Sequence, residues 1–298
     1  MPYAQADIAG DVVLVTGATS GIGEACAWRF AEAGCKLVLT GRRAQRLDSL
    51  KASIEAKHEG VTVTCVTMDV TDLERVAALP GALLPLEVDI LVNNAGLALV
   101  RPDPNLNPSP NRANPHPNPN ANSSPNPNPN QGVAPAEANS MADVQQMMAT
   151  NVTGLIAMSA AFLPGMKARG KGHLINVGSI AGHEAYAGGS GYCASKAAVT
   201  AFTTAARHDL VGTPVRVTCI SPGAVNTEFT TVRLGNKDDA DKVYDNLEPL
   251  VAADRRNPNP NPNPNPNPNP NPNPNPNPNP NPNPNPNPNP NPNPNPNP

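Results

Sequence analysis

Length, composition and charge narrow the class of protein before any motif is considered. The chain has 298 residues, of which 39 are proline, and its formal net charge is −3 at pH 7. A weakly acidic chain lacks the basic field that binds nucleic acid or an anionic membrane surface, so we expect neither partner.

Most of the prolines lie in two Asn-Pro tracts, at residues 101–130 and 257–298. Proline at nearly every second position removes strand hydrogen-bond donors and forbids a helix, so we expect two disordered segments. The remainder, about 225 residues, is enough for one α/β domain. The sequence therefore predicts a single domain over 1–256, interrupted at 101–130, and followed by a disordered tract at 257–298.

The five cysteines are scattered along the chain, without the spacing of metal ligands. We therefore expect reduced thiols in an intracellular protein and no metal site. The segment MPYAQADIAG at the start has no basic or apolar region typical of a signal peptide. No apolar run approaches the roughly 20 residues of a membrane helix, so a cytoplasmic protein is expected.

Residues 12–15 form an uninterrupted apolar run, which predicts a buried parallel strand. The sequence TGATSGIG follows at 16–23, and an amphipathic helix then runs through Phe30 to a stop near Gly34. A strand, a glycine turn and a helix together present backbone N–H groups to a pyrophosphate. The alternative is a tight turn with a purely structural role.

Residues 36–40 predict the second strand, and Gly41-Arg42-Arg43 follows it. An NAD site usually has an acidic residue at this point, which binds the ribose hydroxyls. Two guanidinium groups instead suit a 2′-phosphate, which arginine binds in a forked geometry. NADP is therefore the favoured cofactor, and the alternative is a solvated start of the next helix.

Strands are predicted at 61–68 and 89–92, and helices at 47–57 and at 71–79, the latter closed by Pro80. Asp69 follows the third strand and could meet the amino group of adenine. Asn93-Asn94-Ala95-Gly96 follows the fourth strand. Strands and helices alternate throughout, so we expect a Rossmann-type, doubly wound parallel sheet.

After the insertion, a helix is predicted from Ser140 to Pro164-Gly165, with Ser140 as its N-cap. Asn151 lies on or beside the apolar stripe of this helix. A polar side chain in that position needs a hydrogen-bond partner. Asn151 is therefore either a core residue with its partners satisfied or part of a site.

The fifth predicted strand, 173–177, leads to Ser179, and a helix at 192–211 carries Tyr192 and Lys196. The spacing of four places Tyr192 and Lys196 on one face. An ammonium group beside a phenol lowers the phenol pKa, so Tyr192 could exchange a proton with a substrate hydroxyl near neutral pH. Ser179 could hold the same oxygen. The spacing is common by chance, and the alternative is a solvated helix face.

A sixth strand is predicted at 215–220, and Arg233 lies in the loop after it. Open α/β sheets bind ligands at the carboxyl ends of their strands, so this loop is within reach of the site. A guanidinium group matches a planar carboxylate, which makes Arg233 a candidate for substrate binding. The alternative is a surface arginine in a mobile loop.

Together these residues resemble the short-chain dehydrogenase/reductase family over almost all of 8–253 outside the insertion. The resemblance rests on TGATSGIG at 16–23, NNAG at 93–96, Asn151, Ser179, Tyr192 with Lys196, and Pro222-Gly223 with Thr227. Within the family, TGRR, LPGM, YAGG and TEFTTVR are most similar to NADP-dependent 3-hydroxy acid dehydrogenases that oxidise serine and allo-threonine.

The resemblance implies a proton-transfer role for Tyr192, and a Lys196 that lowers the tyrosine pKa and holds the nicotinamide ribose. It also implies that Ser179 positions the substrate oxygen, and that Asn151 holds a water linking Lys196 to solvent. The cofactor residues that it implies are Gly17, Thr19, Ser20, Gly21, Ile22 and Gly23 at the phosphates, Arg42 and Arg43 at the 2′-phosphate, Asp69 and Val70 at adenine, Asn93 at the adenosine ribose, and Pro222, Gly223, Val225 and Thr227 at the nicotinamide.

The chain departs from the family after residues 251–254, where members continue with a helix and a seventh strand. Here the Asn-Pro tract replaces both, so we expect a sheet without its last strand. Family members form homo-oligomers, and this change removes a surface that they use. The expected function is hydride transfer between NADP and a small 3-hydroxy acid. The alternatives are an inactive dinucleotide-binding scaffold and a dehydrogenase for another alcohol.

Overall fold

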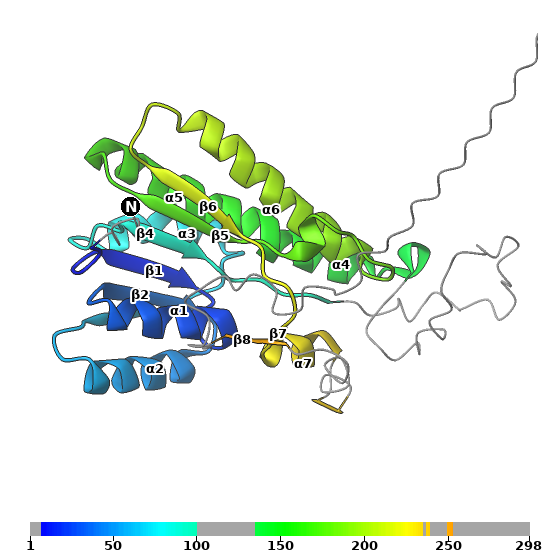
Figure 1. Ribbon diagram of the computed structural model, residues 1–298, viewed down its shortest axis with the longest axis horizontal. Helices are drawn as coiled ribbons and strands as arrows, with labels where there is room; N and C mark the ends of the chain where they lie inside the picture. Colours follow the sequence, from blue (N-terminus) through cyan, green and yellow to red (C-terminus); the bar gives the residue numbers. More distant parts are fainter. Residues whose placement is uncertain (1–6, 100–134, 235–236, 239–248, 253–298) are drawn as a thin grey trace, which may run out of the picture. The chain divides into compact units, whose positions relative to one another are not determined.

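The computed structural model describes residues 7–99, 135–234, 237–238 and 249–252, and both Asn-Pro tracts lie outside them (Figure 1). The chain divides into two units, Met1–Asp254 and Arg255–Pro298, and all the described residues belong to the first. The expected loss of a final helix and strand concerns residues beyond 252, which are outside the described part of the chain.

Within the described residues, six parallel strands form one sheet in the order β3-β2-β1-β4-β5-β6. The strands of this sheet are β1 (Val12–Thr16), β2 (Lys36–Gly41), β3 (Val63–Thr67), β4 (Ile90–Asn93), β5 (His173–Val177) and β6 (Arg216–Ile220). The strand order reverses direction between β1 and β4, which is the point where doubly wound sheets bind ligands. The predicted Rossmann-type fold class is confirmed.

Seven α-helices belong to the described residues. They are α1 (Gly21–Glu32), α2 (Ala44–Lys57), α3 (Leu73–Ala82), α4 (Met141–Met148), α5 (Leu155–Arg169), α6 (Ser190–Asp209) and α7 (Glu228–Leu234). Beyond the main sheet, β7 (Val225–Asn226) pairs in parallel with β8 (Leu250–Val251).

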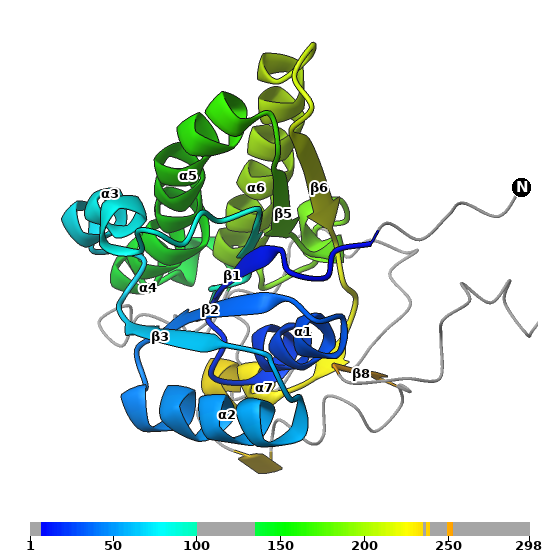
Figure 2. The ribbon, with the colours of Figure 1, turned by 90° about the vertical axis from the view of Figure 1, so that its left-hand side faces the viewer.

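The helices cover the two faces of the sheet separately (Figures 1 and 2). Val13 and Val15 of β1 point to one face, where they join a buried cluster with residues of α1 and α2. Leu14, between them, points to the other face and packs in a cluster with residues of α3 and α5 and with Leu210, which follows α6. Every residue of β1 is buried because a central parallel strand is covered on both sides, which explains its continuous apolar sequence.

Two prolines that the sequence predicts at helix ends lie inside helices instead. Pro80 is within α3, and Pro164 is within α5, which continues to Arg169 and ends at Gly170 in the left-handed conformation. Proline at 164 removes the hydrogen bond to the carbonyl of Ala160. Ala160 is exposed, so water can satisfy that carbonyl and the helix continues.

The helix predicted from Ser140 is also not one regular α-helix. Ser140 caps α4 as expected, with its side chain accepting a hydrogen bond from the backbone N–H of Asp143. A π-helical segment, Ala149–Gly154, then separates α4 from α5 and contains Asn151. Side-chain periodicity does not predict such a segment, because one wide turn changes the backbone hydrogen bonds without changing the composition.

The run Met141–Arg169 is long and apolar enough to meet the length and composition test for a membrane span, which the sequence analysis had not expected of any segment. In the structure this run packs against the sheet, where Met158, Phe162 and Met166 belong to the core cluster with α3. Core helices pass the same test, so we interpret the run as a core helix.

Gly154, the last residue of the π-helical segment, lies against the loop that follows β3. A Cβ added there would lie 2.8 Å from Val70 Cγ2 and 2.9 Å from the Val70 carbonyl oxygen. Gly154→Ala should therefore lower the free energy of unfolding by about 1–3 kcal/mol, as overpacking does. Urea denaturation measures this change.

Gly81 is the matched control, because it is an exposed helical glycine with nothing within 4 Å of an added Cβ. Gly81→Ala should leave the free energy of unfolding unchanged or raise it by up to about 1 kcal/mol. Equal effects of the two substitutions would contradict the close packing at Gly154.

Candidate functional site

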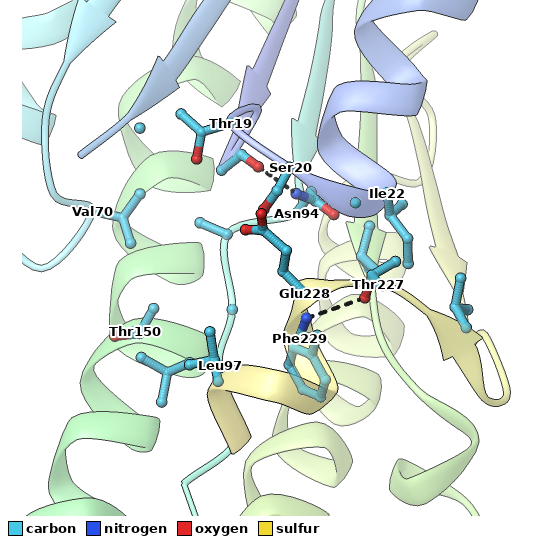
Figure 3. A pocket seen from close by; sticks show the side chains of 18 of the residues that line it. Thr19, Ser20, Ile22, Val70, Asn94, Leu97, Thr150, Thr227, Glu228 and Phe229 are labelled. Carbon is cyan, nitrogen blue, oxygen red and sulfur yellow. Dashed lines mark hydrogen bonds between the residues drawn. The ribbon is translucent and has the colours of Figure 1, made fainter. Parts of the chain in front are cut away.

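A pocket of about 340 Å³ lies at the carboxyl edge of the sheet. The segments that follow β1 to β6 line it, together with residues of α6 and α7 (Figure 3). Parallel strands all end at this edge, so loops from distant parts of the sequence meet there. Most of the predicted site residues line this pocket. The exceptions are Gly23, Asn93, Asn151 and Arg233.

The glycine turn between β1 and α1 forms one wall of the pocket. Gly17 and Gly21 have positive φ angles of 67° and 59°, which other residues rarely adopt. A Cβ at Gly17 would lie 2.9 Å from the Cα of Ala95, and a Cβ at Gly23 would meet the carbonyl oxygen of Gly17. Gly23 thus stands behind the wall, where it allows α1 to approach β1.

The N-terminus of α1 opens onto the pocket. Its N-cap residue, Ser20, makes no side-chain capping hydrogen bond. The first backbone N–H groups of a helix have no partner within the helix, so they are available to an anion. Thr19, Gly21 and Ile22 line the pocket beside Ser20.

Arg43 extends across the glycine turn and holds a carboxylate. Its Nε and one terminal nitrogen donate to Thr19 Oγ1 at 3.0 and 2.7 Å, and the same terminal nitrogen donates to Ser20 Oγ at 2.8 Å. The other terminal nitrogen donates to Glu228 of α7 at 2.9 Å. Arg46 binds the same carboxylate at 2.7 Å. Neither Arg46 nor Glu228 was among the residues predicted from the sequence.

Arg42 turns to a different partner. Its guanidinium group lies 3.6 Å from a carboxylate oxygen of Asp69, which also lines the pocket. Burial alone would raise the pKa of Asp69, but hydrogen bonds from Thr71 and the nearby Arg42 charge hold that pKa below its usual value. The two arginines therefore have different roles in this structure, which their adjacent positions did not indicate.

Asn93, which the resemblance placed at the adenosine ribose, does not line the pocket with its side chain. It is 2% exposed, and its amide donates to Ser159 Oγ and Asn176 Oδ1, both at 3.0 Å. Asn93 is the last residue of β4, and these two partners belong to α5 and β5. The next residue, Asn94, lines the pocket and donates to the carbonyl of Thr16 at 2.9 Å.

Lys196 and Tyr192 lie on one face of α6, both buried and both lining the pocket. Lys196 Nζ donates to the carbonyl oxygen of Val177 at 2.9 Å and lies 5.9 Å from the centre of the Tyr192 ring. Burial lowers the pKa of Lys196 to about 8, and the nearby Cys219 opposes this shift. At neutral pH the ammonium group is therefore still mostly protonated, and it loses its proton above a pH of about 8.

The pKa of Tyr192 differs from the expectation. Burial raises the pKa of Tyr192 to about 12, and a hydrogen bond with Ser179 and the charge of Arg233 only partly oppose it. Lys196 was expected to lower this pKa. In this structure the effect of burial on the Tyr192 pKa dominates, and the Lys196 ammonium group donates to the Val177 carbonyl. The phenol is therefore held in its protonated form.

Asn151 has all its side-chain hydrogen bonds satisfied within the protein. Its Oδ1 accepts from the N–H of Leu97 at 2.8 Å, and its Nδ2 donates to the Leu97 carbonyl at 2.8 Å and to Ser195 Oγ at 3.0 Å. A Cβ at Gly96 would lie 3.3 Å from Asn151 Oδ1 and 3.6 Å from Lys196 Nζ. Of the two alternatives for Asn151, its side chain matches the core residue whose hydrogen bonds are satisfied. Gly96 lies close to both Asn151 and Lys196.

Arg233 of α7 lies beside Tyr186, and its guanidinium carbon is 5.6 Å from the centre of that ring. A hydrogen bond from Arg233 opposes the rise that burial causes in the pKa of Tyr186. The Nε of Arg233 is buried without a hydrogen-bond partner among the described residues. Phe229 and Val232 of the same helix line the pocket, so Arg233 is next to it rather than in its wall.

The chain matches the short chain dehydrogenase family model over residues 11–113 and 126–237. It is 38% identical to an NADP-dependent 3-hydroxy acid dehydrogenase of Schizosaccharomyces pombe, over 82% of this chain and 83% of that protein. It is 38% identical to a serine 3-dehydrogenase of Agrobacterium fabrum, over 82% of this chain and 84% of that protein.

Solved structures of short-chain dehydrogenases also match the chain. The closed form of a serine dehydrogenase complexed with NADP+ matches with a TM-score of 0.66 and 39% identity, over 82% of this chain and 85% of that chain. A short-chain dehydrogenase from Sphingobium yanoikuyae in complex with NADPH matches with a TM-score of 0.64 and 27% identity, over 82% of this chain and 80% of that chain. The expected resemblance is confirmed, and the chain belongs to the short chain dehydrogenase family.

Proposed function

We propose that this protein is an NADP-dependent oxidoreductase that transfers a hydride between the nicotinamide and a small 3-hydroxy acid. The observation that carries the proposal is that Ser179, Tyr192 and Lys196 line one pocket together with the glycine turn and Arg43. The names of the relatives support the cofactor and the substrate class, because they include NADP-dependent 3-hydroxy acid and serine dehydrogenases at 38–41% identity.

The residues present fit an NADP molecule. The glycine turn leaves space that a side chain would fill, and Ser20 leaves the N-terminus of α1 uncapped. Arg43 already donates to a carboxylate through one terminal nitrogen, and its guanidinium group can bind a phosphate in a forked geometry. We assign the 2′-phosphate to Arg43, the diphosphate to the turn, and the nicotinamide half to residues 222–227.

When bound, NADP supplies the hydride acceptor for oxidation of the substrate carbon. Ser179 holds the substrate oxygen through its hydroxyl group, and Tyr192 takes the hydroxyl proton as the carbon loses its hydride. In the reverse direction the protonated phenol donates that proton to the carbonyl oxygen. With NADP bound, Lys196 would hold the nicotinamide ribose, and its charge would favour the phenolate of Tyr192.

We also propose that Arg233 binds the substrate carboxylate. Its buried Nε has no partner among the described residues, and its charge is close enough to lower the pKa of Tyr192. A buried donor without a partner costs free energy, which a carboxylate would recover. Tyr186 supports the guanidinium group from the other side.

The cellular location and the assembly are further proposals. All five cysteines are free thiols, which suits a reducing compartment such as the cytoplasm. The family resemblance suggests a homo-oligomer. Sedimentation velocity of the full chain would test the assembly, and a single monomeric species at micromolar concentration would contradict it.

The function is tested by following absorbance at 340 nm with NADP and serine, allo-threonine or 3-hydroxypropanoate. Turnover of at least one hydroxy acid is expected. NADPH binding without turnover of any of them, or of a broader panel of alcohols, would favour an inactive scaffold.

The pH dependence follows from the two pKa values at the site. Tyr192, with a pKa of about 12, is mostly protonated at neutral pH, so oxidation should be slow there and kcat/KM should rise with pH by about tenfold per unit. Above pH about 8, Lys196 loses its charge and the rise should become shallower.

Tyr192→Phe is the control for this profile. It removes the proton-transfer group, so kcat should fall to background while NADPH affinity changes by less than about twofold. A variant that keeps most of the parent kcat, or a parent profile that is flat with pH, would rule out this role of Tyr192.

Cofactor choice gives a separate test. Arg43→Ala should weaken NADPH binding by about tenfold to a hundredfold, as expected for losing a charge-assisted contact, and should change NADH binding little. Arg42→Ala is the matched variant, and its effect should be smaller because Arg42 pairs with Asp69. Fluorescence titration measures both affinities. An equal loss for NADH and NADPH in Arg43→Ala would contradict phosphate recognition.

Arg233→Ala should raise KM for hydroxy acids by about tenfold or more, since a charge-assisted contact is lost. An uncharged alcohol of similar size should be affected much less. Tyr186→Phe is the comparison variant, because it removes the hydrogen bond to Arg233 and keeps the ring. Equal losses for acid and alcohol would show that Arg233 only orders α7.

A further inference from the structure

The carboxylate of Glu228 occupies one terminal nitrogen of Arg43, the residue that we assign to the 2′-phosphate. Glu228 is the first residue of α7, and its side chain extends from that helix toward Ser20 (Figure 3). It accepts from Arg43 at 2.9 Å, and both its oxygens accept from Arg46 at 2.7 Å. Two guanidinium groups thus converge on one carboxylate at the mouth of the pocket.

Glu228 is charged under ordinary conditions. Hydrogen bonds from Arg43 and Arg46 hold its pKa below the usual value. The Glu228 side chain is 47% exposed and the Arg43 side chain is 41% exposed, so solvent screens the pair. Exposed ion pairs are weak, so a competing anion can displace one partner.

A phosphate bound at Arg43 would compete with Glu228 for the guanidinium donors, and it would lie next to the negative charge of Glu228. A phosphate on Arg43 would also be near Thr19 and Ser20, whose hydroxyl oxygens contact the guanidinium group. Glu228 must then either leave Arg43 or remain next to a second anion. Both outcomes cost free energy that a cofactor without the 2′-phosphate does not meet.

We propose that Glu228 competes with the 2′-phosphate of the cofactor for Arg43, and so limits the preference for NADP over NAD. This inference rests on the proposed function, because it concerns the same phosphate site. Glu228 is then a specificity-determining residue that weakens binding of the 2′-phosphate at Arg43 rather than assisting it.

The start of α7 contacts both Arg43, at the proposed phosphate site, and Tyr192, the proton-transfer residue. Phe229, the next residue of α7, packs on Tyr192 with ring centres 5.9 Å apart. The pairing of Glu228 with the arginines therefore joins the N-terminus of α7 to α2, and Phe229 joins it to the proton-transfer residue. Release of Glu228 by a phosphate frees the first of these two contacts.

The test compares two small probes that differ by one phosphate, adenosine 2′,5′-bisphosphate and 5′-AMP, by isothermal titration calorimetry on the full chain at one ionic strength. Glu228→Gln keeps the shape of the side chain and removes its charge. It should tighten binding of the bisphosphate by about threefold to tenfold and leave 5′-AMP unchanged, as expected for removal of one exposed charge pair.

Glu87→Gln is the matched control. Glu87 pairs with Arg169 at 3.7 Å and does not line the pocket. The substitution removes one negative charge, as Glu228→Gln does. It should alter neither affinity. In an Arg43→Ala background, Glu228→Gln should tighten bisphosphate binding by less than it does in the parent, because the shared partner is gone.

Any one of the following results would overturn the inference. Weaker bisphosphate binding in Glu228→Gln would mean that Glu228 orients Arg43 for the phosphate. No change, or an equal change for both probes, would mean that Glu228 does not act on the phosphate. If the parent binds neither the bisphosphate nor NADPH, the proposed function fails together with the inference. Normal NADPH binding by the parent with no tightening in the variant defeats the inference alone.

Discussion

The parallel pairing of β1 with β4 determines where the glycine turn meets the loop after β4, and the pocket is built on this contact. Thr16 Oγ1 accepts from the backbone N–H groups of Asn94 and Ala95, both at 3.0 Å, and donates to the Val92 carbonyl at 3.3 Å. Asn94 returns a hydrogen bond to the carbonyl of Thr16. Because these bonds bring the two loops together, only glycine fits at position 17.

A second set of buried polar contacts supports the helix that carries Tyr192. Asn93 of β4 binds Asn176 of β5, and Asn176 donates to Thr203 of α6 at 2.9 Å. Ser159 of α5 accepts from Asn93 on the other side. Such networks are strong in a low-dielectric interior and fix one arrangement of the elements that they connect. The asparagine at the end of β4 is thus used for structure, and its neighbour Asn94 faces the pocket.

Local sequence patterns were enough to predict the frame of the site. Apolar runs located the strands, and the glycines of 16–23 located the turn, because both depend on the backbone of a few adjacent residues. The spacing of Tyr192 and Lys196 correctly placed both on one face of α6. The raised pKa of Tyr192 could not be predicted in this way, since it depends on how deeply the completed fold buries the phenol.

Long-range contacts account for most of what the sequence did not reveal. Arg43 and Glu228 are 185 residues apart, and no local pattern indicates that they meet. The different partners of Arg42 and Arg43 arise because successive side chains at a strand end point in different directions. Pro164 appeared to end a helix, yet an exposed carbonyl one turn earlier lets the helix continue.

The π-helical segment allows one stretch of chain to face two different environments. Met147 and Met158 are eleven positions apart, close to three full turns, so an uninterrupted α-helix would place them on the same side. In the structure Met147 packs with Leu97 and Tyr192, whereas Met158 packs in the core cluster with α3. One wide turn takes up an extra residue and rotates α5 relative to α4 by about 100°. The length of a single turn thus lets α4 pack beside Tyr192 while α5 covers the sheet.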